Sequence, residues 1–219
     1  MRWFLTFWNS SIGKKMVMAL TGILLIIFLK IHLIGNLFLF VGADAFNTYA
    51  GTLEHVKPIV RVIEVILALI VFLHILNGVN LWFLNRKARP IGYKVDGSSK
   101  NSTIFSRTMI VSGSVIFIFL VIHLQTFWYV YNFSGTDLTL YEVVVDWFAK
   151  AWYSVLYIIA MILLGFHLNH GFQSAFQTFG WNHSKYNSLI KFIGSAYAII
   201  VSLAFASIPF YFLFFGGNV

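Results

Sequence analysis

Cysteine is absent from the 219 residues of this sequence. The chain therefore cannot form disulfide bonds, ligate an iron–sulfur cluster with its own thiolates, or attach a c-type haem through a Cys-x-x-Cys-His motif. Charged residues are also scarce, at 10% of the sequence, whereas a typical soluble domain has about 25%. Hydrophobic residues make up 59% and the mean hydropathy is +0.83. This composition predicts an integral membrane protein.

Five apolar stretches each reach the ~20 residues that a membrane-spanning helix needs. They lie at about 16–41, 59–84, 108–131, 152–179 and 192–215. The polar connections between them are too short to hold a soluble domain, so we expect one membrane domain over residues 1–219, an all-α bundle of five transmembrane helices. The segment before the first stretch is too short and too polar for a signal peptide, and we expect that stretch to be retained.

The basic residues are unevenly placed. Eleven of the 15 lie in the N-terminal segment and in the second and fourth connections, and the opposite side has Lys57, Arg61 and Lys150 beside most of the acidic residues. By the positive-inside rule this predicts a cytoplasmic N-terminus and an external C-terminus. The net charge of +8 is then a topology signal, and no nucleic-acid partner is expected.

Four histidines occupy matched positions in a weak internal repeat. The first stretch reads TGILLIIFLKIHL up to Leu33, and the third reads SGSVIFIFLVIHL up to Leu124. The second and fourth stretches share the pattern His-x-x-x-Gly. The spacing from His32 to His74 is 42 residues and that from His123 to His167 is 44. The repeat predicts that these histidines have related roles.

Depth along the helices sorts the four histidines into two pairs. His32 and His123 precede the acidic residues of the outer side by 12 and 14 residues, whereas His74 and His167 precede the end of their inward-running helices by 12 and 13. Two levels roughly 10 Å or more apart result. Two imidazoles at one depth on different helices suit a six-coordinate b-type haem. We therefore predict an outer haem b on His32 and His123 and an inner haem b on His74 and His167, as axial ligands of the iron.

Other interpretations of the histidines remain. They could be hydrogen-bonded core residues or a proton relay, whereas zinc is disfavoured because the two levels are too far apart to supply four ligands. His170 lies one turn from His167 and could replace it as a ligand, although the His-x-x-x-Gly match favours His167. His55 and His183 fall in connections and are expected to be ordinary polar residues. Glycines one turn from a histidine would let a porphyrin approach the backbone; these are Gly35, Gly78 and Gly171.

With these residues in place, the sequence resembles the cytochrome b558 membrane anchor of succinate dehydrogenases and fumarate reductases. The similarity is to the single-chain, five-helix, two-haem type found with menaquinone, and it extends over nearly the whole chain. The motifs that carry it are His32-Leu-Ile-Gly-Asn36, Ser106-Arg-Thr-Met, Ser112-Gly113, His123-Leu124, His167-x-x-x-Gly171 and Gly180-Trp181.

This resemblance implies a function that composition cannot show. The chain would conduct electrons between an iron–sulfur subunit and a membrane quinone such as menaquinone, in the respiratory chain of a bacterial cytoplasmic membrane. A flavoprotein subunit that handles succinate or fumarate and the iron–sulfur subunit would dock on the cytoplasmic face, where the basic second connection is the expected docking site. Lys30, two residues before His32, matches no position in the motifs of this family. Two alternatives are a cytochrome b subunit of a hydrogenase or formate dehydrogenase, and a haem-free transporter.

Glu64 is the candidate for chemistry with the quinone. It lies near the outer end of the second stretch, ten residues before His74. A carboxylate at this depth is costly unless it is paired, protonated or hydrated. One interpretation is an ion pair with Arg61, three residues earlier on the same helical face. The other is that Glu64 relays protons to or from a quinone, with Glu54 and His55 at the mouth of the path.

Overall fold

The computed structural model describes residues 6–8, 10–88, 102–181 and 183–216. Regular secondary structure in this part of the chain is entirely helical, and five spans are long and apolar enough to cross a membrane. This confirms the predicted all-α class and the number of spans. The spans are Ser11–Phe40, Lys57–Lys87, Met109–Phe133, Ala151–Thr178 and Asn187–Phe215.

Two of the spans are composite. The first consists of α2 (Ser11–Leu37) and a short 3-10 helix, η1 (Phe38–Phe40). The third consists of α7 (Met109–His123), a π-helical segment η2 (Leu124–Tyr129) and α8 (Val130–Phe133). The others are single helices: α4 (Lys57–Lys87), α10 (Ala151–Thr178) and α11 (Asn187–Phe215). The π-helical turn begins directly after His123, and such turns occur frequently at functional sites.

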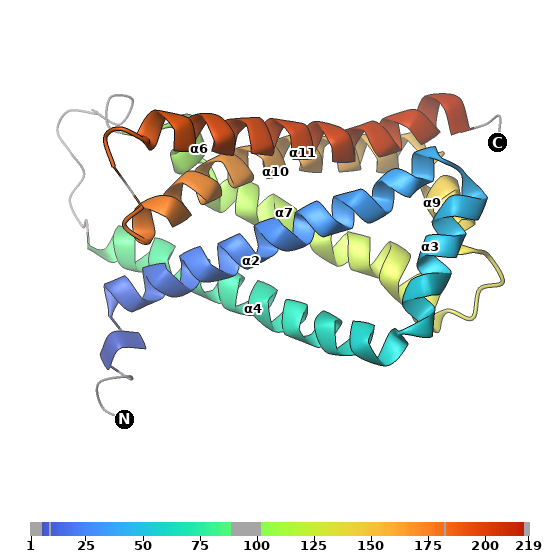
Figure 1. Cartoon of the computed structure of the whole chain (residues 1–219), viewed down its shortest axis with the longest axis horizontal. Coiled ribbons are helices and arrows are strands. Elements are labelled where there is room, and N and C mark those ends of the chain that lie inside the picture. The colour runs from blue at the N-terminus through green and yellow to red at the C-terminus, as the bar shows by residue number, and fades with distance from the viewer. Residues whose placement is uncertain (1–5, 9, 89–101, 182, 217–219) are drawn as a thin grey trace.

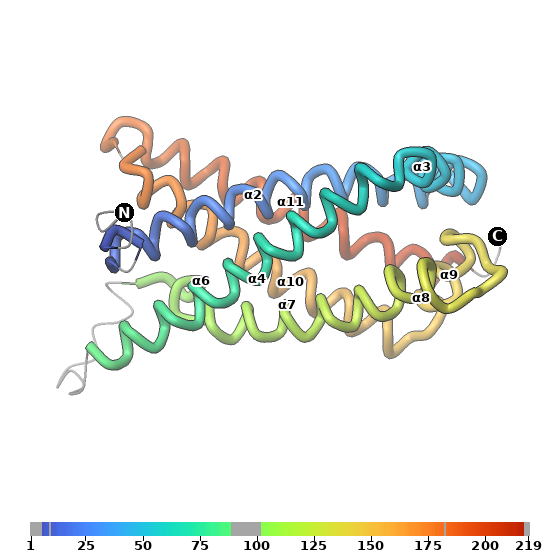
Figure 2. Tube along the Cα trace, turned by 90° about the horizontal axis from the view of Figure 1, so that it is seen from below, coloured from blue at the N-terminus to red at the C-terminus, as the bar shows by residue number. Residues whose placement is uncertain are grey.

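The first and third expected polar connections each contain a helix of two turns or more. The segment after the first span holds α3 (Ala43–His55), and the segment after the third holds α9 (Leu140–Phe148). The side chains of Thr139 and Glu142 form a capping box at the start of α9. Both helices bury one face, through residues such as Phe46 in α3 and Phe148 in α9. They therefore close one end of the bundle, as Figure 2 shows for α3, α8 and α9.

The bundle is packed around α10, which contacts α2, α7 and α11. Its closest packing is against α11, where a Cβ on Gly165 would come within 2.8 Å of the Ser202 hydroxyl oxygen. Small residues at membrane-helix interfaces allow such close approach. In contrast, no residue of α4 is buried, so α4 lies at the edge of the bundle, where its apolar side chains meet lipid.

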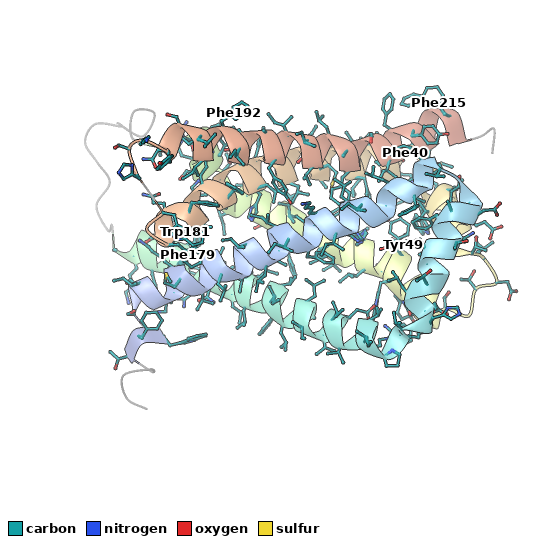
Figure 3. The ribbon with its side chains drawn as sticks, viewed as in Figure 1. Phe40, Tyr49, Phe179, Trp181, Phe192 and Phe215 are labelled. Atoms are coloured by element: carbon teal, nitrogen blue, oxygen red, sulfur yellow. The ribbon has the colours of Figure 1, made fainter. Side chains whose placement is uncertain are left out.

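The two ends of the bundle differ in charge. One end, here called the basic end, has the start of α2, the end of α4, α6 (Ile104–Arg107) and the start of α11 (Figure 1). The other, the acidic end, has α3 and α9. Aromatic side chains mark both ends, with Phe179 and Trp181 at the basic end and Phe40, Tyr49 and Phe215 at the acidic end (Figure 3). Such belts are typical of membrane boundaries.

Which end faces the cytoplasm stays a prediction from the distribution of lysine and arginine. The N- and C-terminal ends of the described chain lie at opposite ends of the bundle, as an odd number of spans requires (Figure 1). Much of the basic second connection, expected to dock partner subunits, lies outside the described residues, including Arg89, Lys94 and Lys100.

Candidate functional site

The structure brings the four histidines of the repeat together in the predicted pairs. His32 of α2 and His123 of α7 have ring centroids 5.8 Å apart. His74 of α4 and His167 of α10 have ring centroids 6.2 Å apart. We call His32 and His123 the acidic-end pair and His74 and His167 the basic-end pair. Each pair joins two helices that do not follow one another in the sequence.

The two pairs lie at different depths. Residue positions along α2 and along α7 give the same distance between the two levels. A Cβ on Gly22 of α2 would lie 3.6 Å from the His74 ring, and a Cβ on Gly113 of α7 would lie 3.4 Å from the His167 ring. His32 and His123 each follow these glycines by ten residues in the sequence. At 1.5 Å per helical residue, the levels are about 15 Å apart. This agrees with the separation expected from the sequence.

The basic-end pair has a hydroxyl group behind each imidazole. The Thr21 hydroxyl lies 3.1 Å from Nδ1 of His74, and the Ser112 hydroxyl lies 3.4 Å from Nδ1 of His167. Each hydroxyl also donates its proton to its own helix, Thr21 to the Val17 carbonyl at 2.8 Å and Ser112 to the Met109 carbonyl at 3.2 Å.

These bonds favour one imidazole tautomer at the basic-end pair. A hydroxyl has one proton, and here a backbone carbonyl accepts it. The hydroxyl oxygen is then an acceptor towards the ring, so Nδ1 of each histidine carries the proton. The lone pair is left on Nε2, the nitrogen available to a metal. The Thr-Gly and Ser-Gly pairs of the repeat thus orient histidines on neighbouring helices, a role that the sequence pattern alone did not indicate.

The acidic-end pair has a different environment. Nδ1 of His123 lies 3.0 Å from the Tyr157 hydroxyl, and Tyr157 accepts a 2.9 Å hydrogen bond from the hydroxyl of the fully buried Tyr153. Nε2 of His32 lies 3.4 Å from the side-chain nitrogen of Asn36. Aromatic rings enclose both imidazoles, through Phe28, Phe119, Phe127 and Phe205.

The remaining histidines lie apart from the two pairs. His170 lines a cleft at the basic end together with Arg107 and Lys191, whereas His167 is the residue beside His74. This arrangement agrees with the predicted register of α10. His55 is exposed on α3 and bonds the Gly51 carbonyl, and His183 is exposed in the turn before α11. Both are surface residues, as expected.

The glycines one turn from a histidine have different surroundings. A Cβ on Gly35 would meet the Tyr49 ring, and one on Gly78 would meet the Met18 side chain. At Gly171 a Cβ would meet nothing within 4 Å. Contact of these three glycines with a porphyrin stays a prediction. The glycines that lie against the imidazoles are Gly22 and Gly113. They are part of the repeat, which was the signal that could have found them.

Glu64 takes part in a network of side chains that joins α4 to the third span. Its carboxylate accepts from Arg61 at 2.6 Å and from the Trp128 indole at 3.1 Å. Arg61 also donates to the Asn132 side chain at 2.6 Å. The ion pair with Arg61 considered from the sequence is therefore present. The side chains of Glu64 and Arg61 remain about one-third exposed, at 31% and 34%.

A comparison with protein families identifies the family of the chain. Residues 85–206 match the model of the succinate dehydrogenase/fumarate reductase transmembrane subunit, more than half of the chain. The chain belongs to this family. It is thus a membrane subunit of a succinate dehydrogenase or fumarate reductase, and the hydrogenase, formate dehydrogenase and transporter alternatives lose their support. His123 and His167 lie inside the matched region, whereas His32 and His74 precede it. Comparisons with curated proteins and with solved structures give no significant match.

Proposed function

We propose that this subunit is a di-haem cytochrome b anchor of the b558 type that conducts electrons between an iron–sulfur subunit and a membrane quinone. The observation that carries the proposal is the arrangement of the histidines. Two pairs of imidazoles lie at two depths of one helical bundle, and each pair faces across from one helix to another.

The residues of each pair fit a six-coordinate haem iron. A metal bound to a nitrogen of each of two imidazoles at about 2 Å leaves the ring centroids roughly 6 Å apart, and the observed separations are 5.8 and 6.2 Å. In the described part of the chain, no three histidine or acidic side chains gather into a metal site. Two neutral nitrogen donors without a third ligand suit a haem better than zinc.

His74 and His167 would hold one haem b, and His32 and His123 would hold the other. Thr21 and Ser112 fix the rings of the first pair so that Nε2 is the ligand, and such outer partners also raise the basicity of the imidazole. When bound, each haem would supply reversible one-electron transfer. The surrounding helices exclude water and keep the local dielectric constant low.

The soluble partners would bind at the basic end. Family membership implies association with the other subunits of the complex. We place the iron–sulfur subunit and the succinate- or fumarate-handling flavoprotein at this end, on the cytoplasmic face of a bacterial membrane, because the basic residues gather there. The basic-end pair then lies closer to the iron–sulfur subunit, and the acidic-end pair lies closer to the opposite membrane surface.

Quinone would react near the acidic-end pair, with menaquinone as the expected species. Glu64, one-third exposed and ten residues from His74 on α4, lies towards this end. Its carboxylate would exchange protons with the quinone, while Arg61 and Trp128 hold it in place. Glu54 and His55 on α3 provide polar groups nearby on the surface.

Haem quantitation tests the central proposal. We expect two b-type haems per chain in the purified complex, visible as low-spin α-bands in a reduced-minus-oxidised spectrum. Each of the four histidine-to-alanine variants should lose one haem signal, or convert it to high spin, and keep the other in part. A purified complex with one haem per chain, or none, contradicts the proposal.

The role of Glu64 has a separate test. Glu64→Gln should slow quinone-coupled turnover while electron transfer from succinate to an artificial dye and both haem spectra stay unchanged. Asp146→Asn, at an exposed carboxylate paired with Lys150, is the matched control. Arg61→Gln distinguishes proton exchange from simple pairing: if the ion pair is all that matters, both variants of the pair lose the same activity. Full quinone activity in Glu64→Gln places the quinone site elsewhere.

A further inference from the structure

A cleft of about 680 Å³ opens at the basic end between α6, the last turns of α10 and the first two turns of α11. We call it the basic cleft. Figure 1 shows these three elements at the same end of the bundle. The lining residues are Ser102, Thr103, Ile104, Ser106, Arg107, His170, Gln173, Ser174, Gln177 and Lys191. All but Ile104 have polar side chains, and none is acidic.

The floor of the basic cleft is a polar stripe on α10. His170, Gln173, Ser174 and Gln177 are spaced so that they share one helical face. The stripe is about 10 Å long at 1.5 Å per residue. Arg107 and Lys191 come from α6 and α11, so a cation lies on each neighbouring element. The ion pairs in the described part of the chain all lie at the acidic end, so neither cation of the cleft has a carboxylate partner there.

The positive-inside rule explains the two cations but not the polar stripe. Glutamine and serine do not contribute to topology. Gln173 donates to the Asn169 side chain at 2.7 Å, and all four residues of the stripe line the cleft. The stripe ends just before Phe179 and Trp181, the aromatic residues that mark the membrane boundary at this end (Figure 3). The basic cleft is therefore at the depth of the lipid headgroups, and its cations, hydroxyls and amides are donors for a compact anion with several acceptor oxygens.

We propose that the basic cleft binds the phosphate of an anionic phospholipid such as phosphatidylglycerol. Basic pockets between membrane helices bind anionic headgroups in this way. Arg107 and Lys191 would contact the phosphate from two sides, and the α10 stripe would donate hydrogen bonds to the phosphate and glycerol oxygens. The acyl chains would lie along the apolar outer surfaces of α10 and α11. This inference does not depend on haem ligation.

Binding of phosphatidylglycerol to the intact complex tests the proposal. The complex with the full chain is placed in phosphatidylcholine nanodiscs, with and without phosphatidylglycerol, and bound lipid is counted by native mass spectrometry. Arg107 and Lys191 would contact the headgroup directly, and two such contacts together strengthen anionic-lipid binding about thirtyfold, so Arg107→Gln with Lys191→Gln should weaken it by that factor. Lys87→Gln with Lys185→Gln removes the same charge from the same end outside the cleft, and should leave it unchanged. Arg107→Lys with Lys191→Arg should retain binding.

Four results would overturn the proposal. Equal loss of phosphatidylglycerol in both double variants would mean that the whole basic end attracts the lipid, and no loss in either would mean that the cleft does not bind it. A haem signal lost from the cleft variant, with lipid binding intact, would assign the cleft to the carboxylates of a haem, since His170 is one turn from His167. Loss of the co-purifying soluble subunits alone would assign it to protein docking.

Discussion

The basic-end and acidic-end pairs resemble one another in spacing and differ in what stands behind each imidazole. At the basic end, small hydroxyls of Thr21 and Ser112 lie behind His74 and His167. At the acidic end, a buried tyrosine lies behind His123, and the ring is enclosed by aromatic side chains. Tyr157 in turn accepts a hydrogen bond from Tyr153. The repeat thus reproduces the ligands but not their surroundings.

This difference determines how far each imidazole is fixed. At the basic end the hydroxyl protons go to backbone carbonyls, so the tautomer of both histidines follows from the available hydrogen bonds. At the acidic end the proton of Tyr157 has no such carbonyl partner among the described residues. Tyr157 can therefore donate to Nδ1 of His123 or accept from it. We infer that the basic-end pair is preset as a ligand pair, whereas the acidic-end pair becomes one only when His123 donates to Tyr157.

The largest expected effect separates His167 from His170. His167→Ala should remove the haem of the basic-end pair and keep that of the acidic-end pair, because His167 faces His74. His170→Ala should keep both low-spin signals, since His170 lines the basic cleft. The measurement is haem content and the low-spin spectrum of each purified variant. If His170→Ala loses a haem and His167→Ala does not, the register of α10 and the definition of the basic-end pair are both wrong.

A smaller effect should follow from removing the partners behind the rings. Ser112→Ala should raise the midpoint potential of the basic-end haem and Tyr157→Phe that of the acidic-end haem, because loss of an acceptor for Nδ1–H lowers the basicity of the ligand. We expect shifts of tens of millivolts, since about 59 mV corresponds to a tenfold change for one electron. Spectroelectrochemical titration resolves the two haems.

Matched variants make this comparison specific. Ser114→Ala changes an exposed serine two residues along the same helix and should shift neither potential. Tyr153→Phe removes the donor to Tyr157 and should affect the acidic-end haem alone. Should Tyr157→Phe shift both haems equally, or Ser112→Ala shift the acidic-end one, the separate control of the two pairs is refuted.

The spans and the histidine pairs could be predicted because both leave strong patterns in the sequence. An apolar run of about 20 residues has few alternatives to a membrane helix, and the depth of a histidine follows from counting residues to the charged flanks. Thr21 and Ser112 were visible in the repeat, but their partners were not. A repeat shows which positions are equivalent and does not show which helices are neighbours.

The helices at the acidic end were missed for another reason. α3 and α9 are short and mix polar with apolar residues, so their composition resembles that of a connection. The capping box of α9, Thr139 and Glu142 before an apolar run, was a signal that could have found it. The π-helical turn after His123 left no sequence signal of this kind. In the structure η2 contacts α9 and α7 contacts α4, and contacts between such distant segments are not visible in the sequence.

The smallest expected effect concerns α9, which covers the acidic-end pair. Phe148 of α9 packs against Tyr157 with ring centroids 5.0 Å apart, and α9 begins at the capping box. Hydrogen bonds from the backbone and side chain of Thr139 lower the pKa of Glu142 below its ordinary value of 4.5. Because the pKa is lowered on folding, the charged carboxylate of Glu142 stabilises the folded state. This stabilisation is complete at pH values above the ordinary pKa and is lost as the pH falls through the pKa of the folded state.

Hydrogen exchange of the α9 amides, corrected for the intrinsic rate at each pH, should therefore show less protection in acid for the wild type. Glu142→Gln keeps a neutral capping side chain. Its α9 amides should therefore be less protected than those of the wild type at neutral pH, and their protection should not change with pH. In acid the wild type and Glu142→Gln should reach the same protection. Glu142→Ala should be less protected than either throughout. The α10 amides around Ala160, which is buried in the core with Ala198 of α11, serve as the internal reference. If the wild type and Glu142→Gln have the same protection at neutral pH, the charged capping box does not hold α9. In that case, packing of Phe148 and its apolar neighbours holds α9 over the acidic-end pair.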